Sequence, residues 1–173
     1  MFPSPLLLIV VAGAASLASA SDPPLWPFPQ EVQCNATGPV RPVADPAHFS
    51  FSATGVTSDI LTGALKRYAK LTFLKSSARV NRFRSVGSTV QELRVDVRTD
   101  NQSLALGMDE SYSLTLHGSY VELVANTVFG AVRGLETFSQ LVEEHEDGFG
   151  MWVCDVVDAP RCVLPPRAFI NSL

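Results

Sequence analysis

Residues 127–142 read TVFGAVRGLETFSQLV, and this stretch decides the fold. Its apolar residues recur at intervals of three and four, which predicts an amphipathic helix with one face on a hydrophobic core. Gly130 and Gly134 have the spacing of a membrane helix pair, but Arg133 and Glu136 exclude that reading because they would lie in the bilayer. The glycines instead predict close packing of the helix on a sheet. The apolar face comprises Val128, Ala131, Val132, Leu135, Phe138 and Leu141.

Alternating apolar and polar residues on both sides of this helix predict strands. The segment before it has the pattern of a hairpin, with His117, Gly118 and Ser119 as the turn. The predicted strands cover residues 48–52, 90–97, 112–116, 121–123 and 149–157.

A second helix is predicted to begin at Ser58, which is a good N-cap, with Asp59 at the positive end of the helix. Its apolar face comprises Leu61, Ala64, Leu65, Tyr68 and Leu71. The resulting order, strand, helix, three strands, helix, strand, predicts an α+β fold: a mostly antiparallel β-sheet with two helices on one face.

Composition limits the function classes. The chain has 173 residues, of which 46% are hydrophobic and 17% charged, as is typical of one folded domain. Lys and Arg number 13 against 17 for Asp and Glu, a net charge of −4. This balance leaves little basic surface for phosphates, so we expect no nucleic-acid partner.

The first 20 residues resemble a secretory signal peptide. Residues 6–20 read LLLIVVAGAASLASA, an apolar run that is too short for a membrane span and ends in small residues. We expect no membrane span after its removal. Secretion makes the sequons at Asn35 and Asn101 predicted glycosylation sites.

Three cysteines, Cys34, Cys154 and Cys162, enter this oxidising compartment, so at least one stays free or pairs between chains. The sequence does not say which two pair. Neither their spacing nor the three scattered histidines has the pattern of a metal site. We therefore expect no metal and no cofactor.

No familiar catalytic motif is present in the chain, and we expect no catalytic residue. The adjacent carboxylates Asp109 and Glu110 are best explained as a solvated strand entry. Residues 143–147, EEHED, predict a charged turn rather than a calcium loop. Trp26 and Trp152 predict packing positions in the core or at an edge.

Five segments together resemble one enzyme family. Residues 127–142 are very similar to the second helix of the small N-terminal domain of glycoside hydrolase family 20, the β-N-acetylhexosaminidases of eukaryotic lysosomal type. Residues 25–30 (LWPFPQ) resemble the family's opening motif, residues 110–116 (ESYSLTL) a strand, residues 65–68 (LKRY) the end of the first helix, and residues 158–161 (DAPR) the closing motif.

This resemblance implies three parts: a signal peptide over residues 1–20, a hexosaminidase-like α+β domain over 21–161, and a divergent tail over 162–173. The tail stands where the family has its catalytic (β/α)8 barrel, so we expect a truncated chain that is inactive alone. The parent enzyme would remove terminal N-acetylglucosamine or N-acetylgalactosamine from glycoconjugates by a substrate-assisted retaining mechanism.

The resemblance also implies partners: the barrel of the same chain and a second hexosaminidase subunit. The expected location is the secretory pathway, ending in the lysosome or outside the cell. The alternative is a secreted binding or regulatory module that docks on a full-length hexosaminidase.

Overall fold

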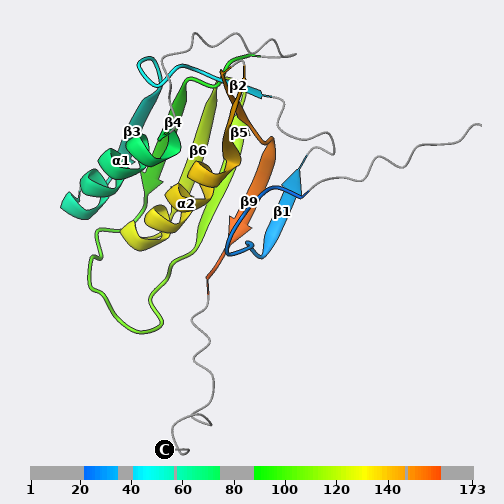
Figure 1. The fold of residues 1–173 in the computed structure, drawn as a ribbon. Coiled ribbons are helices and arrows are strands. Elements are labelled where there is room, and N and C mark those ends of the chain that lie inside the picture. Colours follow the sequence, from blue (N-terminus) through cyan, green and yellow to red (C-terminus); the bar gives the residue numbers. More distant parts are fainter. Residues whose placement is uncertain (1–21, 35–40, 57, 75–87, 147, 161–173) are drawn as a thin grey trace, which may run out of the picture.

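The computed structural model describes residues 22–34, 41–56, 58–74, 88–146 and 148–160. A six-stranded sheet carries both helices on one face, as Figure 1 shows. The predicted α+β architecture is therefore confirmed. The predicted signal peptide, Asn35, Cys162 and the divergent tail lie outside the described residues.

The large sheet has the order β1-β9-β5-β6-β4-β3. Its strands are β1 (Glu31–Cys34), β3 (Ser50–Gly55), β4 (Glu92–Val97), β5 (Tyr112–His117), β6 (Tyr120–Ala125) and β9 (Cys154–Asp158). Pairing is antiparallel from β1 to β6, and β4 pairs in parallel with both β6 and β3. The sheet is thus mostly antiparallel with a parallel part, which the helix between β3 and β4 makes possible as a crossover.

Helix α1 (Asp59–Thr72) begins where the sequence predicts. The Ser58 side chain accepts a hydrogen bond from the backbone N–H of Ile60 and so caps the helix. Leu61, Ala64 and Tyr68 are buried as predicted. Leu71, which was predicted on the same face, is 45% exposed. The position four residues after Tyr68 is Thr72, so Thr72 continues the buried face and Leu71 lies beside it.

Helix α2 (Val128–Leu141) lies against β5 and β6, and Thr127 caps it through Gly130 N–H. A Cβ atom on Gly130 would lie 2.4 Å from the Ser111 carbonyl oxygen, and one on Gly134 2.2 Å from Leu123 Cδ1. Both distances are far below van der Waals contact. The two glycines therefore allow the close helix-to-sheet packing that the sequence predicts.

A second, three-stranded sheet was not predicted. It has the order β2-β8-β7 and consists of β2 (Arg41–Val43), β7 (Val142–His145) and β8 (Gly148–Met151). The predicted strand 149–157 is thus two strands in different sheets. The predicted charged turn at 143–147 is also wrong, because residues 143–145 pair with β8 and, of the described residues, Glu146 alone lies in a turn.

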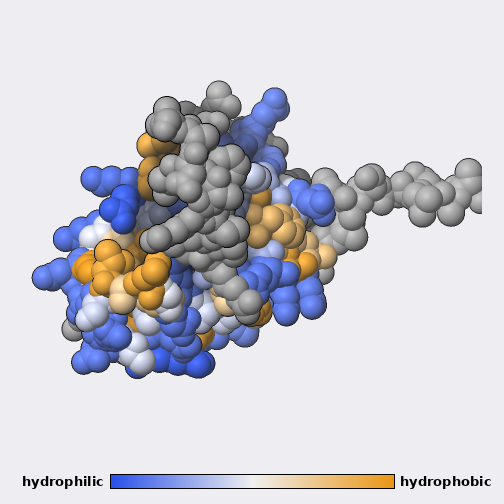
Figure 2. Space-filling model, turned by 90° about the horizontal axis from the view of Figure 1, so that it is seen from below, coloured by the Kyte–Doolittle hydropathy of each residue, from blue (hydrophilic) through white to orange (hydrophobic). Residues whose placement is uncertain are grey.

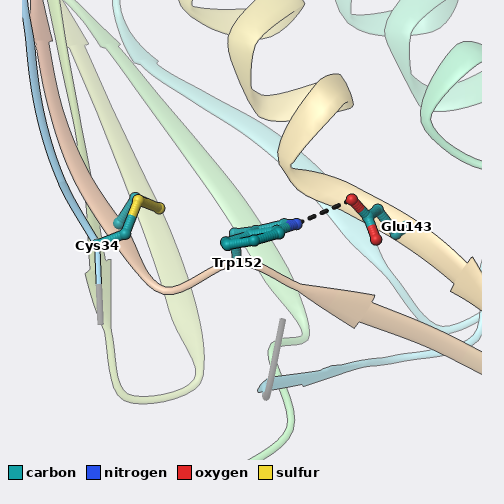
Figure 3. Close-up of a disulfide and its surroundings, with 4 residues drawn as sticks. Cys34, Glu143 and Trp152 are labelled. Atoms are coloured by element: carbon teal, nitrogen blue, oxygen red, sulfur yellow. Dashed lines mark hydrogen bonds between the residues drawn. A yellow bond between two sulfur atoms is a disulfide. The ribbon is translucent and has the colours of Figure 1, made fainter. Parts of the chain in front are cut away.

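Trp152 lies between β8 and β9. It is 5% exposed, as its predicted packing position requires. Its backbone N–H donates to the Leu141 carbonyl, and its indole N–H donates to Glu143 over 2.9 Å. In Figure 3 the indole points to Glu143, on the side away from Cys34. Cys34 forms a disulfide with Cys154, which joins β1 to the first residue of β9.

The face of the large sheet away from the helices is mostly polar, with Val157 of β9 as an exposed apolar residue. Glu92 accepts hydrogen bonds from the Ser52 hydroxyl and from Arg94 Nε, each over 2.8 Å. The Arg94 guanidinium lies 3.9 Å from the ring centre of Tyr120. We call this the open face, and its cross-strand pairs suit a surface that faces water.

Candidate functional site

A hollow of about 750 Å³ lies at the end of the molecule where α2 begins and β9 ends. Three segments far apart in the sequence line it: Trp26 and Pro27, residues 104–112, and residues 158–160, with α2 on one side. Figure 1 places the loop between β4 and β5 and the end of β9 together at the bottom of the molecule. Viewed from below, Figure 2 shows hydrophobic surface at this end among hydrophilic surroundings.

Large apolar side chains are exposed around the hollow. Trp26 is 84% exposed, Leu104 80% and Leu106 82%. A soluble domain rarely gathers such residues without a partner, since exposed apolar surface is unfavourable in water. The hollow is therefore the candidate functional site, and its apolar rim is suited to binding a polypeptide surface.

Residues 25–30 form the strap, which builds one wall of the hollow. The strap is tied to α2 through Gln140, whose side-chain oxygen accepts from the Trp26 backbone N–H over 2.6 Å. Gln140 Nε2 donates to the Trp26 carbonyl over 2.9 Å. One amide side chain thus satisfies both backbone groups of Trp26, and the indole is left to point outward.

The other end of the strap is tied to the place where the chain leaves β9. The Gln30 backbone N–H donates to the Asp158 carboxylate over 3.2 Å, and Gln30 Nε2 donates to the Ala159 carbonyl over 2.8 Å. Residues 158–160 also line the hollow. Any polypeptide that continues beyond Pro160 therefore starts at the rim of the hollow.

Buried hydroxyl groups meet beneath the hollow. The hydroxyls of Tyr112 and Thr137 share a hydrogen bond of 2.6 Å. The pKa of Tyr112 is raised to about 12, chiefly because the side chain is buried, and the nearby Asp158 carboxylate also raises it. This tyrosine is therefore neutral at physiological pH and serves as a hydrogen-bonding group rather than as a base.

The two adjacent carboxylates lie on the rim but do not act together. Asp109 accepts from the Ser111 backbone N–H over 2.9 Å and from Asn126 Nδ2 over 2.8 Å. These hydrogen bonds, with Ser111 as the larger cause, hold the pKa of Asp109 below its usual value. The Asp109 carbonyl also accepts from the Thr127 hydroxyl, so this residue fastens the N-terminus of α2.

Glu110 instead forms an ion pair with Arg133, over 2.9 Å. The predicted strand entry thus accounts for both residues, because each carboxylate is engaged in a structural contact.

A smaller hollow adjoins the first one along the helices and shares Trp26, Pro27 and Arg133 with it. At its edge the Tyr68 hydroxyl donates to Glu136 over 2.5 Å and so links α1 to α2. Burial, followed by this carboxylate, raises the pKa of Tyr68 to about 12. Glu136 also accepts from Gln140 over 3.1 Å, which connects the pair of helices to the strap.

Asn101 is exposed in the loop between β4 and β5, as its predicted role as a glycan acceptor requires. Its side-chain oxygen accepts from the Ser103 backbone N–H over 3.0 Å. Within the described ranges, no cluster of three His, Cys, Asp or Glu is arranged as a metal site. None of the helices described is long and apolar enough to cross a membrane.

Sequence reasoning missed the exposed position of Trp26, for which it predicted packing. The only sequence signal was the four prolines that flank it at residues 23, 24, 27 and 29. Such prolines favour extended backbone that remains outside the regular elements. They do not indicate which side chain of the segment is buried.

Comparison with known proteins matches residues 25–141 to a family described as beta-acetyl hexosaminidase like. Over 92% of its own length, the chain is 34% identical to the beta-hexosaminidase subunit beta of Mus musculus. Over 89% of its own length, it is 35% identical to the beta-hexosaminidase subunit alpha of Bos taurus. It covers 32% and 30% of those proteins, so it spans about three tenths of the curated relatives it matches.

Among solved structures, a chitobiase of Flavobacterium johnsoniae superposes with a TM-score of 0.62 and 26% identity. The superposition covers 79% of this chain and 21% of the chitobiase. The similarity therefore extends over nearly all of the described fold and a minor part of the larger proteins.

Proposed function

Because the chain belongs to the glycoside hydrolase family 20 hexosaminidases and forms the N-terminal domain of that family, we propose that it serves a β-N-acetylhexosaminidase as a non-catalytic domain. In this role residues 22–160 supply no group to the reaction. Their task is to stabilise and position the catalytic part of the enzyme.

The observation that carries this proposal is the hollow, where exposed Trp26, Leu104 and Leu106 surround the point at which the chain leaves β9. Relatives that are about three times as long continue from a matching domain. A catalytic domain that follows Pro160 would cover this apolar rim at once. Burying it would hold the two domains together, since removal of apolar surface from water is the main driving force for such contacts.

The reaction of the whole enzyme follows from the family. The parent would release terminal N-acetylglucosamine or N-acetylgalactosamine, with the 2-acetamido oxygen of the substrate attacking the anomeric carbon. The carboxylates that assist this step would belong to the catalytic barrel. A second hexosaminidase subunit would be a further partner of the parent.

The secretory pathway, ending in the lysosome or outside the cell, is the proposed location. Two observations support it: a disulfide joins Cys34 to Cys154, and Asn101 lies exposed in a sequon. Glycosidase treatment of the chain secreted from animal cells should increase its gel mobility. Asn101→Gln should remove part of that change, and an unchanged mobility in the wild type would contradict glycosylation.

The test of function is hydrolysis of a chromogenic N-acetylglucosaminide. The purified 173-residue chain should release no product above the blank, whereas the mouse subunit beta, purified in parallel, should release it. Activity that follows the pure chain through two chromatographic steps would overturn the proposal. Sequencing the transcript across the Arg161 codon then tells whether a barrel is encoded in the same reading frame.

The alternative function, a regulatory module that docks on a full-length hexosaminidase, has a separate test. In that case the tagged chain would co-purify with the intact mouse subunit beta. The proposed function predicts no co-purification, because the intact subunit carries its own N-terminal domain and its docking surface is occupied.

A further inference from the structure

Trp26 combines two properties that rarely occur together. Its side chain is 84% exposed and lines both hollows, yet its backbone is held at the N–H and at the carbonyl by one side chain, Gln140. Exposed segments are usually left free to move, because fixing them costs conformational entropy. Here two hydrogen bonds of 2.6 and 2.9 Å fix the backbone under an indole that contacts solvent.

Gln140 is itself fixed by a relay that begins in the helices. Its side-chain nitrogen also donates to Glu136, whose other oxygen accepts from the Tyr68 hydroxyl. The relay joins both helices to the strap, so the direction of the Trp26 backbone depends on the packing of the domain. Such preorganisation lowers the entropic cost of binding, since the side chain is ordered before the partner arrives.

Tryptophan is among the residues most enriched at the energetic centres of protein interfaces. The neighbours of Trp26 in the larger hollow, Leu104 and Leu106, give the apolar surroundings that such a centre needs. By contrast, Phe28, two residues along the strap, is 56% exposed and lines neither hollow. The strap thus offers a matched control within its own sequence.

We propose that Trp26 is the anchor with which this domain holds the polypeptide that follows Pro160 in the longer family members, and that Gln140 is the positioning residue for the anchor. The inference rests on the proposed function. The occupant is indicated by the path of the chain: residues 158–160 line the hollow, and Gln30 ties them to the strap that carries Trp26. Because the polypeptide that follows Pro160 belongs to the same chain, its effective concentration at Trp26 is high.

The experiment uses a chimera in which residues 22–160 replace the matching part of the mouse subunit beta, compared with the 173-residue chain carrying Cys162→Ser. Leu106→Cys reports access to the hollow, and Phe28→Cys reports access to the strap outside it. A small thiol reagent is applied to both proteins, and mass spectrometry follows the rate at each introduced thiol.

Both introduced thiols should react freely in the 173-residue chain. In the chimera, Leu106→Cys should be protected by about 30-fold, the range expected for a buried interface centre, while Phe28→Cys keeps its rate. Adding Trp26→Ala should remove most of the protection, and Trp26→Phe should restore part of it.

Gln140→Ala should also reduce the protection, and combining it with Trp26→Ala should add nothing further, because both changes remove the same anchor. A merely structural role of Gln140 would give additive effects and would overturn its assignment as a positioning residue.

The outcomes separate the two proposals. If Leu106→Cys reacts equally fast in both proteins, or if the chimera is not secreted while the mouse subunit is, the docking of this domain is wrong and the proposed function fails with it. If the hollow is protected but Trp26→Ala leaves the protection unchanged, the docking holds and the anchor is wrong.

Discussion

The open face of the sheet and the hollow are both surfaces of one small domain, but they are built in opposite ways. On the open face, charged and polar groups pair with one another: Ser52 with Glu92 and Arg94 with the Tyr120 ring across strands, and Glu92 with Arg94 along β4. Around the hollow, large apolar side chains such as Trp26 and Leu106 are exposed. The polar groups there fasten the backbone of the rim instead of covering it.

The difference shows which of the two surfaces is stable in contact with water and which one favours a covering partner. A sheet face with its polar groups satisfied among themselves needs nothing more than water. An apolar rim held rigid by backbone contacts gains free energy only when something covers it. Four predictions test whether the two regions behave as separately as this comparison requires, from the largest expected effect to the smallest.

The largest effect is expected from removing the disulfide with Cys34→Ser and Cys154→Ser. The crosslink spans 120 residues of sequence, and loss of a native disulfide typically costs about 2–5 kcal/mol of the free energy of unfolding. Because it ties β1, the strand that follows the strap, the loss should loosen the wall of the hollow first. Hydrogen exchange should accelerate in β1 and the strap more than in β4 and β6. Uniform acceleration would contradict the separation of the two regions.

Next in size is Gly130→Ala, which places a methyl group 2.4 Å from the Ser111 carbonyl oxygen beneath the rim. Overpacking of this kind typically costs about 1–3 kcal/mol, measurable as a lower midpoint of urea unfolding. Gly63→Ala in α1 is the matched control, since beyond its chain neighbours and the backbone of its own helix no atom lies within 4 Å of its new Cβ. That control should be neutral or stabilising, by up to about 1 kcal/mol, through helix propensity alone. Equal losses in both variants would contradict the packing argument.

The third prediction concerns Tyr112, the tyrosine beneath the hollow. We expect it to contribute to the decline of the free energy of unfolding above pH 10. The pKa of Tyr112 is raised to about 12 in the fold, against about 10 in an unfolded chain. Its contribution is therefore complete below pH 10 and is lost as the pH rises towards 12. Tyr112→Phe should cost about 1–2 kcal/mol at neutral pH, because Thr137 loses its partner, and should flatten the decline above pH 10. Tyr120→Phe on the open face is the control, and an identical flattening there would sink the prediction.

The smallest effects concern one carboxylate in each region. The pKa values of Glu92 on the open face and Asp109 on the rim are both lowered, chiefly by hydrogen bonds from Ser52 and Ser111 respectively. A lowered pKa stabilises the fold above the unfolded value near pH 4, and this contribution is lost as the pH falls. Glu92→Gln and Asp109→Asn should each make acid unfolding less steep. Only Asp109→Asn should also increase exchange at the first amides of α2, because its side chain holds Asn126, the residue before the Thr127 cap; unchanged exchange would contradict this positioning role.

Much of the fold could be predicted from residue patterns. The periodicity of residues 127–142 indicated α2, its buried face and the close approach of its two glycines, because an amphipathic helix encodes its packing in its own spacing. Ser58 indicated the start of α1 for the same local reason. The hairpin of β5 and β6 followed from alternation around a short turn.

The small sheet could not be predicted in this way. Strands β2, β7 and β8 have only three or four residues each, which is too short for alternation to be visible. The partner of β2 is also remote in sequence, since Arg41 pairs with Met151. β7 and β8 form a close hairpin, but the charged residues of β7 looked like a turn because they show no alternation of apolar and polar side chains.

The sequence by itself determined the family, through its motifs, and the α+β class, the two helices and the Ser58 cap, through patterns of residues close along the chain. Only the tertiary structure decided which cysteines pair, that β4 lies parallel between β3 and β6, and that Trp26 faces outward over the hollow. The disulfide and the position of Trp26 depend on segments more than a hundred residues apart, such as Trp26 and Gln140, whose contact no local pattern encodes. The candidate site belongs to this second group, since folding alone brings its three lining segments together.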